Sequence, residues 1–382
     1  MKCEVAVIGG GVIGLSCAWR LAQKGVKVLL LERGELAREA SWTAGGMIAP
    51  GCETIHATDE DAAMSLLCHQ SRGLYADFAA ELFDLTGIDA ELSLAESTFS
   101  DWRTPGILLL GEKDHALSWS SKNEYFDLSS LPFLSPQTYD LPALWLPDEG
   151  QVDNRKLTLA LAQAARQSGV QIWEDAPVQR IVCDGEKISY IESAAGKVQA
   201  EKVLLCTGAW SGQIEGLPQN CLPPVRPIAG QMLALRPAGG IDRVIYAKPD
   251  IYLIPRRDGR LVLGSSVEEL GFTKHTTAEH AERKWREACA IVPTLKDSKV
   301  VEHWCGFRPA APDELPILGQ SELKNLYIAT GHHRNGILLA PVTAELMTEH
   351  LINNTPIDSA FSPLRFFREQ SMASQTNKLD SP

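Results

Sequence analysis

The chain has 382 residues, of which 45% are hydrophobic and 22% are charged. This is the composition of a globular protein, and the length predicts two domains. The net charge of -12 arises without a basic block anywhere, so nucleic acid is not expected as a partner. The nine cysteines are scattered without a CxxC pair, which predicts reduced thiols and a cytoplasmic protein. No apolar run is long enough to span a bilayer, so no membrane partner is expected.

The first residues combine two kinds of pattern. Cys3–Ile8 predicts a short strand, Val12–Lys24 has the spacing of a helix, and Val26–Leu31 predicts a second strand. The sequence Gly-Gly-Gly-Val-Ile-Gly, residues 9–14, separates the first strand from the helix. This order of strand, glycine turn, helix and strand predicts a dinucleotide-binding unit.

Each residue of this unit has a physical role. Gly9 permits the tight turn, Gly11 lets a pyrophosphate approach the backbone, and Gly14 lets helix and strand pack closely. The phosphates would then lie at the positive end of the helix. Glu32 ends the second strand, where its carboxylate can accept hydrogen bonds from the ribose hydroxyls. Because NAD uses the same scaffold, these residues alone do not distinguish NAD from FAD.

The remaining chain alternates between α/β and β-rich segments. A long amphipathic helix is predicted over Ala62–Phe83, and a helix capped by Asp153 is predicted to end at Gly169. A last helix is predicted over Gly336–Leu351 and another near Ala278–Ala290. Apolar runs predict strands at Gly106–Leu110, Val170–Trp173, Val178–Val182, Ile188–Ile191, Val203–Cys206, Gln231–Leu235, Ile251–Ile254, Leu261–Leu263, Val300–Phe307 and Leu326–Ala329.

Three stretches resemble one known family. They are ASWTAGGMIAP at residues 40–50, CTGAW at 206–210 and GHHRNGILLAP at 331–341. Together they resemble the D-amino-acid oxidase superfamily of flavoproteins, and within it the bacterial glycine oxidases associated with thiamine biosynthesis. The likeness extends from residue 3 to about residue 352. It implies the α/β and α+β fold class: a Rossmann-like FAD-binding domain of the glutathione-reductase type with an interleaved antiparallel-sheet substrate domain.

The resemblance also implies how the chain divides. The FAD-binding domain would comprise residues 1–85, 151–215 and 309–365, and the substrate-binding domain residues 86–150 and 216–308. Residues 366–382 are expected to form a flexible tail. The family's glycine oxidases assemble as homo-oligomers, so a homo-oligomer is expected here too.

The family's FAD is expected to bind non-covalently, because residues 309–311 are Pro-Ala-Ala where some relatives have an anchoring cysteine. The small residues 44–46 would let the backbone lie close to the isoalloxazine. Backbone N–H groups of residues 335–338, at a helix start, would stabilise negative charge at the flavin N1–C2=O edge. The expected cofactor-binding residues are Gly9, Gly11, Val12, Ile13, Gly14, Glu32, Arg33, Ser41, Thr43, Ala44, Gly45, Gly46, Met47, Val178, Thr207, Gly208, Trp210, His332, Arg334, Asn335, Gly336, Ile337 and Leu338.

The resemblance further implies a substrate site. Arg308 would bind the carboxylate of a small amino acid bidentately, and the Tyr252 hydroxyl would add a hydrogen bond. Arg334 would either help to close the site or pair with an acidic neighbour. No protein side chain is expected to act as catalytic acid or base, because hydride passes from the α-carbon to flavin N5 once the amine is unprotonated. Gly45 and His333 depart from the family pattern, which bears on the amine that fits.

The expected reaction is oxidative deamination of glycine, sarcosine, D-alanine or D-proline to the 2-oxo acid and ammonia or amine. Molecular oxygen would accept the electrons and form hydrogen peroxide. A D-amino-acid dehydrogenase that reduces a quinone or carrier and a sarcosine oxidase are the alternatives. Tyr252 and Arg308 argue against a non-catalytic flavin-binding protein. The flavin domain of a tRNA-modifying enzyme would require a basic surface, which the sequence lacks.

Overall fold

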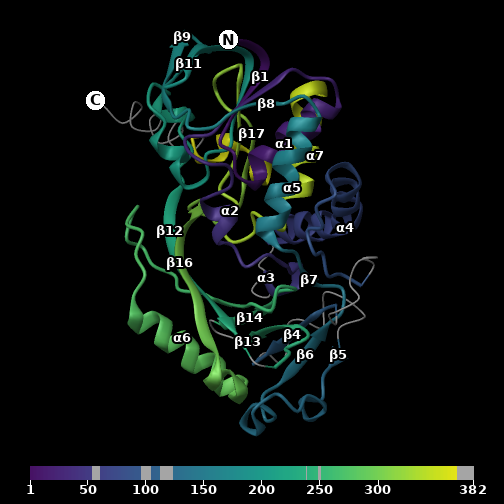
Figure 1. Ribbon diagram of the computed structural model, residues 1–382. Coiled ribbons are helices and arrows are strands. Elements are labelled where there is room, and N and C mark those ends of the chain that lie inside the picture. Colours follow the sequence, from purple (N-terminus) through teal and green to yellow (C-terminus); the bar gives the residue numbers. More distant parts are fainter. Residues whose placement is uncertain (54–60, 96–104, 112–123, 238, 248–250, 368–382) are drawn as a thin grey trace, which may run out of the picture.

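Two eight-stranded sheets organise the chain (Figure 1). The computed structural model describes all residues except 54–60, 96–104, 112–123, 238, 248–250 and 368–382. Most of the predicted tail, residues 366–382, therefore lies outside the described residues. The two sheets meet around the middle of the molecule, where segments from both ends of the sequence lie close together (Figure 1).

The first sheet has a parallel centre. β1 (Lys2–Ile8) pairs in parallel with β2 (Val28–Leu31) on one side and with β11 (Gly196–Leu205) on the other. The order β17-β18-β11-β1-β2-β8 places β1 centrally, so the turn after β1 emerges at the middle of the sheet. The other strands are β8 (Gln171–Trp173), β9 (Val178–Asp184), β10 (Lys187–Ser193), β17 (Ile317–Gln320) and β18 (Leu326–Thr330).

Four helices build the main core beside this sheet. α1 (Val12–Gln23) packs against α5 (Asn154–Gln167) and α7 (Ala340–Asn353), and α4 (Asp61–Thr86) packs against both α5 and α7 (Figure 1). The fully buried rings of Trp19 on α1 and Phe78 on α4 meet edge to face, with centroids 5.5 Å apart. These predicted helices are confirmed, although the last one begins later than expected.

β11 is longer than the sequence pattern indicated. The prediction covered only Val203–Cys206, whereas the strand begins at Gly196. Its first half is polar, with alternating exposed and buried side chains, and it pairs antiparallel with β10. A strand with one face in solvent has an apolar side chain only at every second position. A search for continuous apolar runs therefore overlooks such a segment.

The second sheet is largely antiparallel and has the order β16-β12-β15-β14-β13-β4-β6-β5. The long strands β12 (Arg226–Arg236) and β16 (Lys299–Ala310) pair along their whole length. α6 (Ala278–Ile291) packs on β12, β14 and β15. The remaining strands are β4 (Ile107–Leu110), β5 (Glu124–Tyr125), β6 (Ala143–Leu146), β13 (Val244–Ala247), β14 (Ile251–Pro255) and β15 (Leu261–Gly264).

Side chains alternate between the two faces of this second sheet. On β14, Leu253 joins the buried cluster that includes residues of α6, whereas Tyr252 and Ile254 join the cluster on the other face. That other cluster includes Ala49, which follows the ASWTAGG stretch of the chain. The period of two therefore places Tyr252 on the face directed towards the first sheet.

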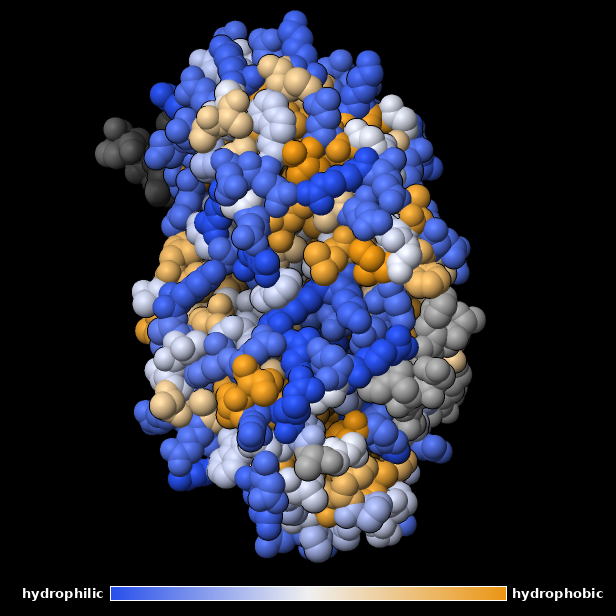
Figure 2. All heavy atoms as spheres, in the orientation of Figure 1, coloured by the Kyte–Doolittle hydropathy of each residue, from blue (hydrophilic) through white to orange (hydrophobic). Residues whose placement is uncertain are grey.

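Short elements connect the two sheets. α2 (Ala40–Thr43) is followed by β3 (Met47–Ile48), which pairs with β7 (Gly150–Gln151), and then by α3 (Pro50–Glu53). The face drawn in Figure 2 is mostly hydrophilic, with hydrophobic residues in separate patches. Among the residues that the structure describes, no helix combines the length and apolar character needed to cross a membrane.

Candidate functional site

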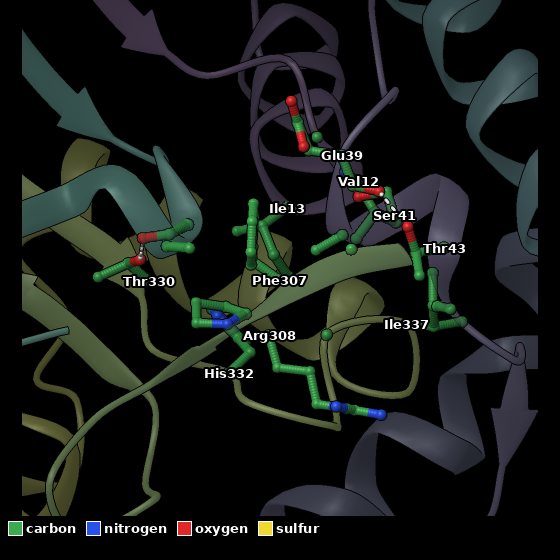
Figure 3. Close-up of a pocket in the computed structure, with 18 of the residues that line it drawn as sticks. Val12, Ile13, Glu39, Ser41, Thr43, Phe307, Arg308, Thr330, His332 and Ile337 are labelled. Atoms are coloured by element: carbon green, nitrogen blue, oxygen red, sulfur yellow. Dashed lines mark hydrogen bonds between the residues drawn. The ribbon is translucent and has the colours of Figure 1, made fainter. Parts of the chain in front are cut away.

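A cavity of about 580 Å³ lies between the glycine turn after β1 and the inner face of the second sheet. Figure 3 shows Val12 and Ser41 on one side of it and Phe307 and Arg308, carried by β16, on another. The structure brings the residues predicted from the sequence together in its wall, including both Tyr252 and Arg308. Gly14 is the exception among them, because it lies beneath the turn.

The glycine turn requires glycine at two positions. Gly9 has φ of +106°, and a Cβ atom there would lie 2.4 Å from the carbonyl oxygen of Cys206. A Cβ atom on Gly14 would lie 1.9 Å from the carbonyl oxygen of Gly9. At Gly11 the nearest atom to such a Cβ would be Ser41 Oγ, at 3.2 Å. The turn is therefore compact underneath and more open at Gly11, where a pyrophosphate is expected.

Glu32 and Ser41 both hold the turn in place. The Glu32 carboxylate accepts hydrogen bonds from the N–H groups of Gly10, at 2.7 Å, and Gly34, at 3.1 Å. A carboxylate oxygen has a second lone pair, so these bonds are compatible with a further one to a ribose hydroxyl. Ser41 Oγ accepts from the N–H of Val12 at 2.9 Å, so this serine caps the first turn of α1.

The cavity wall also contains Glu39, a charged residue that was not predicted from the sequence. The Arg33 guanidinium lies over the Trp210 ring, 3.5 Å from its centroid, and donates to Glu39 at 2.6 Å. Glu39 also pairs with Lys274, at 2.6 Å, from the segment after β15. Glu39 directly precedes the ASWTAGG stretch, and this position is the only feature of the sequence that could have predicted its place in the cavity wall.

The segment before α7 corrects one prediction. The helix begins at Ala340 and not at Gly336, because Pro341 favours the first turn of a helix. Residues 333–334 and 336–339 form turns, and the Asn335 N–H donates to the carbonyl oxygen of His332 at 2.8 Å. The predicted helix start at Gly336 is therefore wrong and the Asn335 N–H is already bonded, whereas the part predicted for the N–H groups of residues 336–338, which line the cavity, stays a prediction.

Two histidines in the wall are neutral. Burial lowers the pKa of His332 to about 3, and its Nε2 lies 3.0 Å from Thr343 Oγ1. Burial, together with the charges of Arg308 and Arg334, also lowers the pKa of His333 to about 3. The 3.6 Å contact between His333 and Glu314 is therefore not an ion pair. Both imidazoles are therefore uncharged at neutral pH.

Arg308 is oriented by neutral oxygen atoms. Its guanidinium donates to Ser265 Oγ at 2.5 Å and to the carbonyl oxygens of Ser266, at 3.1 Å, and Ala229, at 3.3 Å. Gly230 lies against it, because a Cβ atom there would be 2.4 Å from Nη1. The planar head group therefore has a fixed position on β16.

Tyrosines occupy the neighbouring strands. The Tyr252 hydroxyl donates to Met232 Sδ at 3.1 Å, and the Tyr252 and Tyr246 rings have centroids 6.4 Å apart. The Tyr246 hydroxyl accepts from Arg334 Nη2 at 3.3 Å, and both residues line the cavity. Sequence reasoning missed Tyr246 because the four-residue strand β13 was not predicted.

The chain contains a parallel βαβ unit, and the glycine turn of this unit faces a cavity beneath the second, antiparallel sheet. This arrangement is typical of a dinucleotide-binding protein. Comparison with known proteins then specifies the cofactor. The model of the FAD dependent oxidoreductase family matches residues 4–350. The chain belongs to this family and is an FAD-dependent oxidoreductase.

Several relatives are similar over nearly the whole chain. A protein of Pseudomonas aeruginosa named "Glycine oxidase" is 33% identical, with 94% of this chain and 97% of the relative covered. The "Bifunctional protein ThiO/ThiG" of Synechocystis is 38% identical over 95% of this chain, but the chain spans only 54% of it. The crystal structure of glycine oxidase from Geobacillus kaustophilus superposes with a TM-score of 0.84 at 27% identity, covering 95% of this chain and 99% of the other.

Proposed function

We propose that the enzyme oxidises glycine and other small amines or D-amino acids, among them sarcosine, D-alanine and D-proline, to the 2-oxo acid. Ammonia or an amine is released, and molecular oxygen accepts the electrons to give hydrogen peroxide. One observation carries the proposal: Arg308 and Tyr252, on two strands of the second sheet, line the same cavity as the glycine turn. Relatives named glycine oxidase support the choice of substrate.

Arg308 and Tyr252 would hold the substrate carboxylate. An arginine fork binds a carboxylate bidentately, and its charge makes these hydrogen bonds stronger than neutral ones. The contacts with Ser265, Ser266 and Ala229 fix the plane of the Arg308 guanidinium before substrate arrives. Tyr252 would turn its hydroxyl from Met232 to the carboxylate, exchanging a weak sulfur acceptor for a charged one.

The charges around the cavity favour an unprotonated substrate amine. Burial is the main cause that lowers the pKa of His333, and the positive charges of Arg308 and Arg334 add to it. The Arg334 charge would act in the same direction on an ammonium group bound near His333, whereas the Arg308 charge would be balanced by the substrate carboxylate. The proposed oxidation needs no side chain that accepts the α-hydrogen as a proton.

The residues present fit FAD. The compact turn at Gly9 and Gly14 leaves the start of α1 facing the cavity, and Glu32 lies at the end of β2. When bound, FAD supplies the hydride acceptor for the oxidation. The Ala44–Met47 loop, which also lines the cavity, would contact the flavin ring, and Tyr252 and Arg308 would hold the substrate on the opposite side of the cavity.

The test is anaerobic reduction of the purified flavoprotein with glycine, sarcosine, D-alanine and D-proline, followed by visible absorbance. At least one of them should bleach the flavin, and admission of air should restore its colour with formation of hydrogen peroxide. Lack of bleaching by all four would refute the proposed substrate class. Bleaching without reoxidation by air, but with reoxidation by a quinone, would instead identify a dehydrogenase.

A further inference from the structure

Arg256, directly after β14, is a buried cation that the substrate site does not include. Its side chain is 4% exposed, and burial lowers the pKa of its guanidinium. Arg256 is not part of the cavity wall. Its position follows from the sequence, because it lies four residues after Tyr252, where β14 turns back towards β15.

The guanidinium of Arg256 connects the two halves of the site. Nη1 donates to the carbonyl oxygen of Val152 at 2.8 Å and to Gln151 Oε1 at 3.2 Å. Nη2 donates to the carbonyl oxygen of Gly45 at 2.7 Å and to Asn154 Oδ1 at 3.1 Å. All four acceptors belong to the β3–β7 and α5 region, whereas the arginine belongs to the second sheet.

Asn154 extends this connection to α2. Its Nδ2 donates to the carbonyl oxygens of Ser41, at 2.7 Å, and Trp42, at 3.1 Å. Asn154 is 3% exposed, so these bonds are shielded from water. Arg256 therefore holds both ends of the segment from α2 to Gly46, which forms the cofactor side of the cavity.

Packing contacts also limit how closely this segment can approach β14. A Cβ atom at Gly45 would lie 2.9 Å from Ile254 Cδ1 and 3.2 Å from Tyr252 Cε2. A Cβ atom at Gly46 would lie 2.2 Å from the carbonyl oxygen of Val152. Gly45 thus lets the loop approach β14 closely, and Gly46 lets it approach Val152, whose carbonyl oxygen also accepts from Arg256.

We propose that Arg256 is a positioning residue that sets the separation between the Ala44–Met47 loop and the strand that carries Tyr252. Since the loop is expected to contact the flavin and Tyr252 the substrate, this separation determines how closely the α-carbon approaches the flavin. This consequence rests on the proposed function. Arg308 lies on β16 and is held by other partners, so its part in carboxylate binding should not depend on Arg256, and only the hydrogen bond of Tyr252 should weaken.

The first test replaces Arg256 with lysine and compares two properties of the flavoprotein. A lysine ammonium is one compact group, so it cannot donate to all four oxygen atoms that the two Nη atoms of Arg256 reach. The rate constant of anaerobic flavin reduction at saturating amine should fall at least about tenfold, as expected for a misplacement of the order of 1 Å. The dissociation constant of acetate, read from perturbation of the flavin spectrum, should rise by no more than about fivefold, since only the neutral hydrogen bond of Tyr252 would be lost.

The matched control is Arg257→Lys. Arg257 is the next residue and forms an exposed ion pair with Asp89, 2.6 Å away. This variant should match the wild type in reduction rate and spectrum. If Arg256→Lys also matched the wild type in both, or lowered only the melting temperature, the residue would be merely structural and the inference would be overturned.

A second pair of variants changes the same separation from the loop side. Gly45→Ala should slow flavin reduction because its methyl group meets Ile254 Cδ1, and adding Ile254→Val, which removes that atom, should restore much of the rate. An unchanged rate in Gly45→Ala would contradict the inference. If no amine reduces the wild type, the proposed function fails. The inference is then decided by whether Arg256→Lys, but not Arg257→Lys, shifts the visible flavin bands.

Discussion

Replacing Gly230 with alanine should displace Arg308 without removing any of its atoms. A Cβ atom there would lie 2.4 Å from Nη1 and 2.6 Å from Nη2, whereas ordinary contacts begin at 3.4 Å. The guanidinium must therefore recede by about 1 Å. Losing one charge-assisted hydrogen bond to the substrate carboxylate costs about 1.5–3 kcal/mol, which weakens binding about ten- to hundredfold. Stability should change little, because the displaced atoms end a flexible side chain.

The assay is the dissociation constant of acetate and the Michaelis constant of glycine, measured beside the melting temperature. Gly73→Ala is the control, because nothing lies within 4 Å of a Cβ atom at this position on α4. Both constants should rise in Gly230→Ala and stay unchanged in Gly73→Ala. Equal affinities in Gly230→Ala and the wild type would refute the assignment of Arg308 as the carboxylate ligand.

Three further predictions concern the turn, the tyrosine and the histidine. Gly14→Ala should abolish FAD retention, because its methyl group would overlap the carbonyl of Gly9; recovery of yellow protein at wild-type yield would contradict this. Tyr252→Phe removes one hydrogen bond worth about 1 kcal/mol, so it should raise the Michaelis constant of glycine roughly fivefold and leave the melting temperature unchanged. His333 has a folded pKa of about 3, below its unfolded value of 6.5, so the unfolded chain binds more protons between these values. Stability should therefore be full above pH 6.5 and fall towards pH 3. His333→Asn, which suits the left-handed φ of +46°, should make that slope shallower by up to about 1.4 kcal/mol per pH unit in urea titrations.

Local patterns predicted the elements that carry most of the cavity wall. The glycine turn between Ile8 and Val12 and the acidic end of β2 are short-range signals, since they depend on neighbours along the chain. The Asp153 cap is likewise local, and its carboxylate accepts from the N–H groups of Arg155 and Lys156 at 3.0 Å. These features could be predicted because their physical cause lies within a few residues.

The features that escaped prediction depend on distant partners. Tyr246 belongs to the wall because β13 pairs in parallel with β4, more than 130 residues earlier. Glu39 meets Lys274 only after the second sheet has folded over the first. Likewise, the Asn335 N–H is already bonded to His332 because the chain turns before Pro341, which a helical spacing of apolar residues does not indicate.

Arg256 shows why such a long-range partner matters for a two-sheet enzyme. A cofactor held by one sheet and a substrate held by the other react only at a distance that neither sheet defines alone. A buried arginine is costly to desolvate, and each of its four hydrogen bonds offsets part of that cost. Together these bonds favour one spacing between Gly45 and the strand that carries Tyr252. In the proposed site, the separation of flavin and substrate would therefore depend on how the two sheets pack against each other.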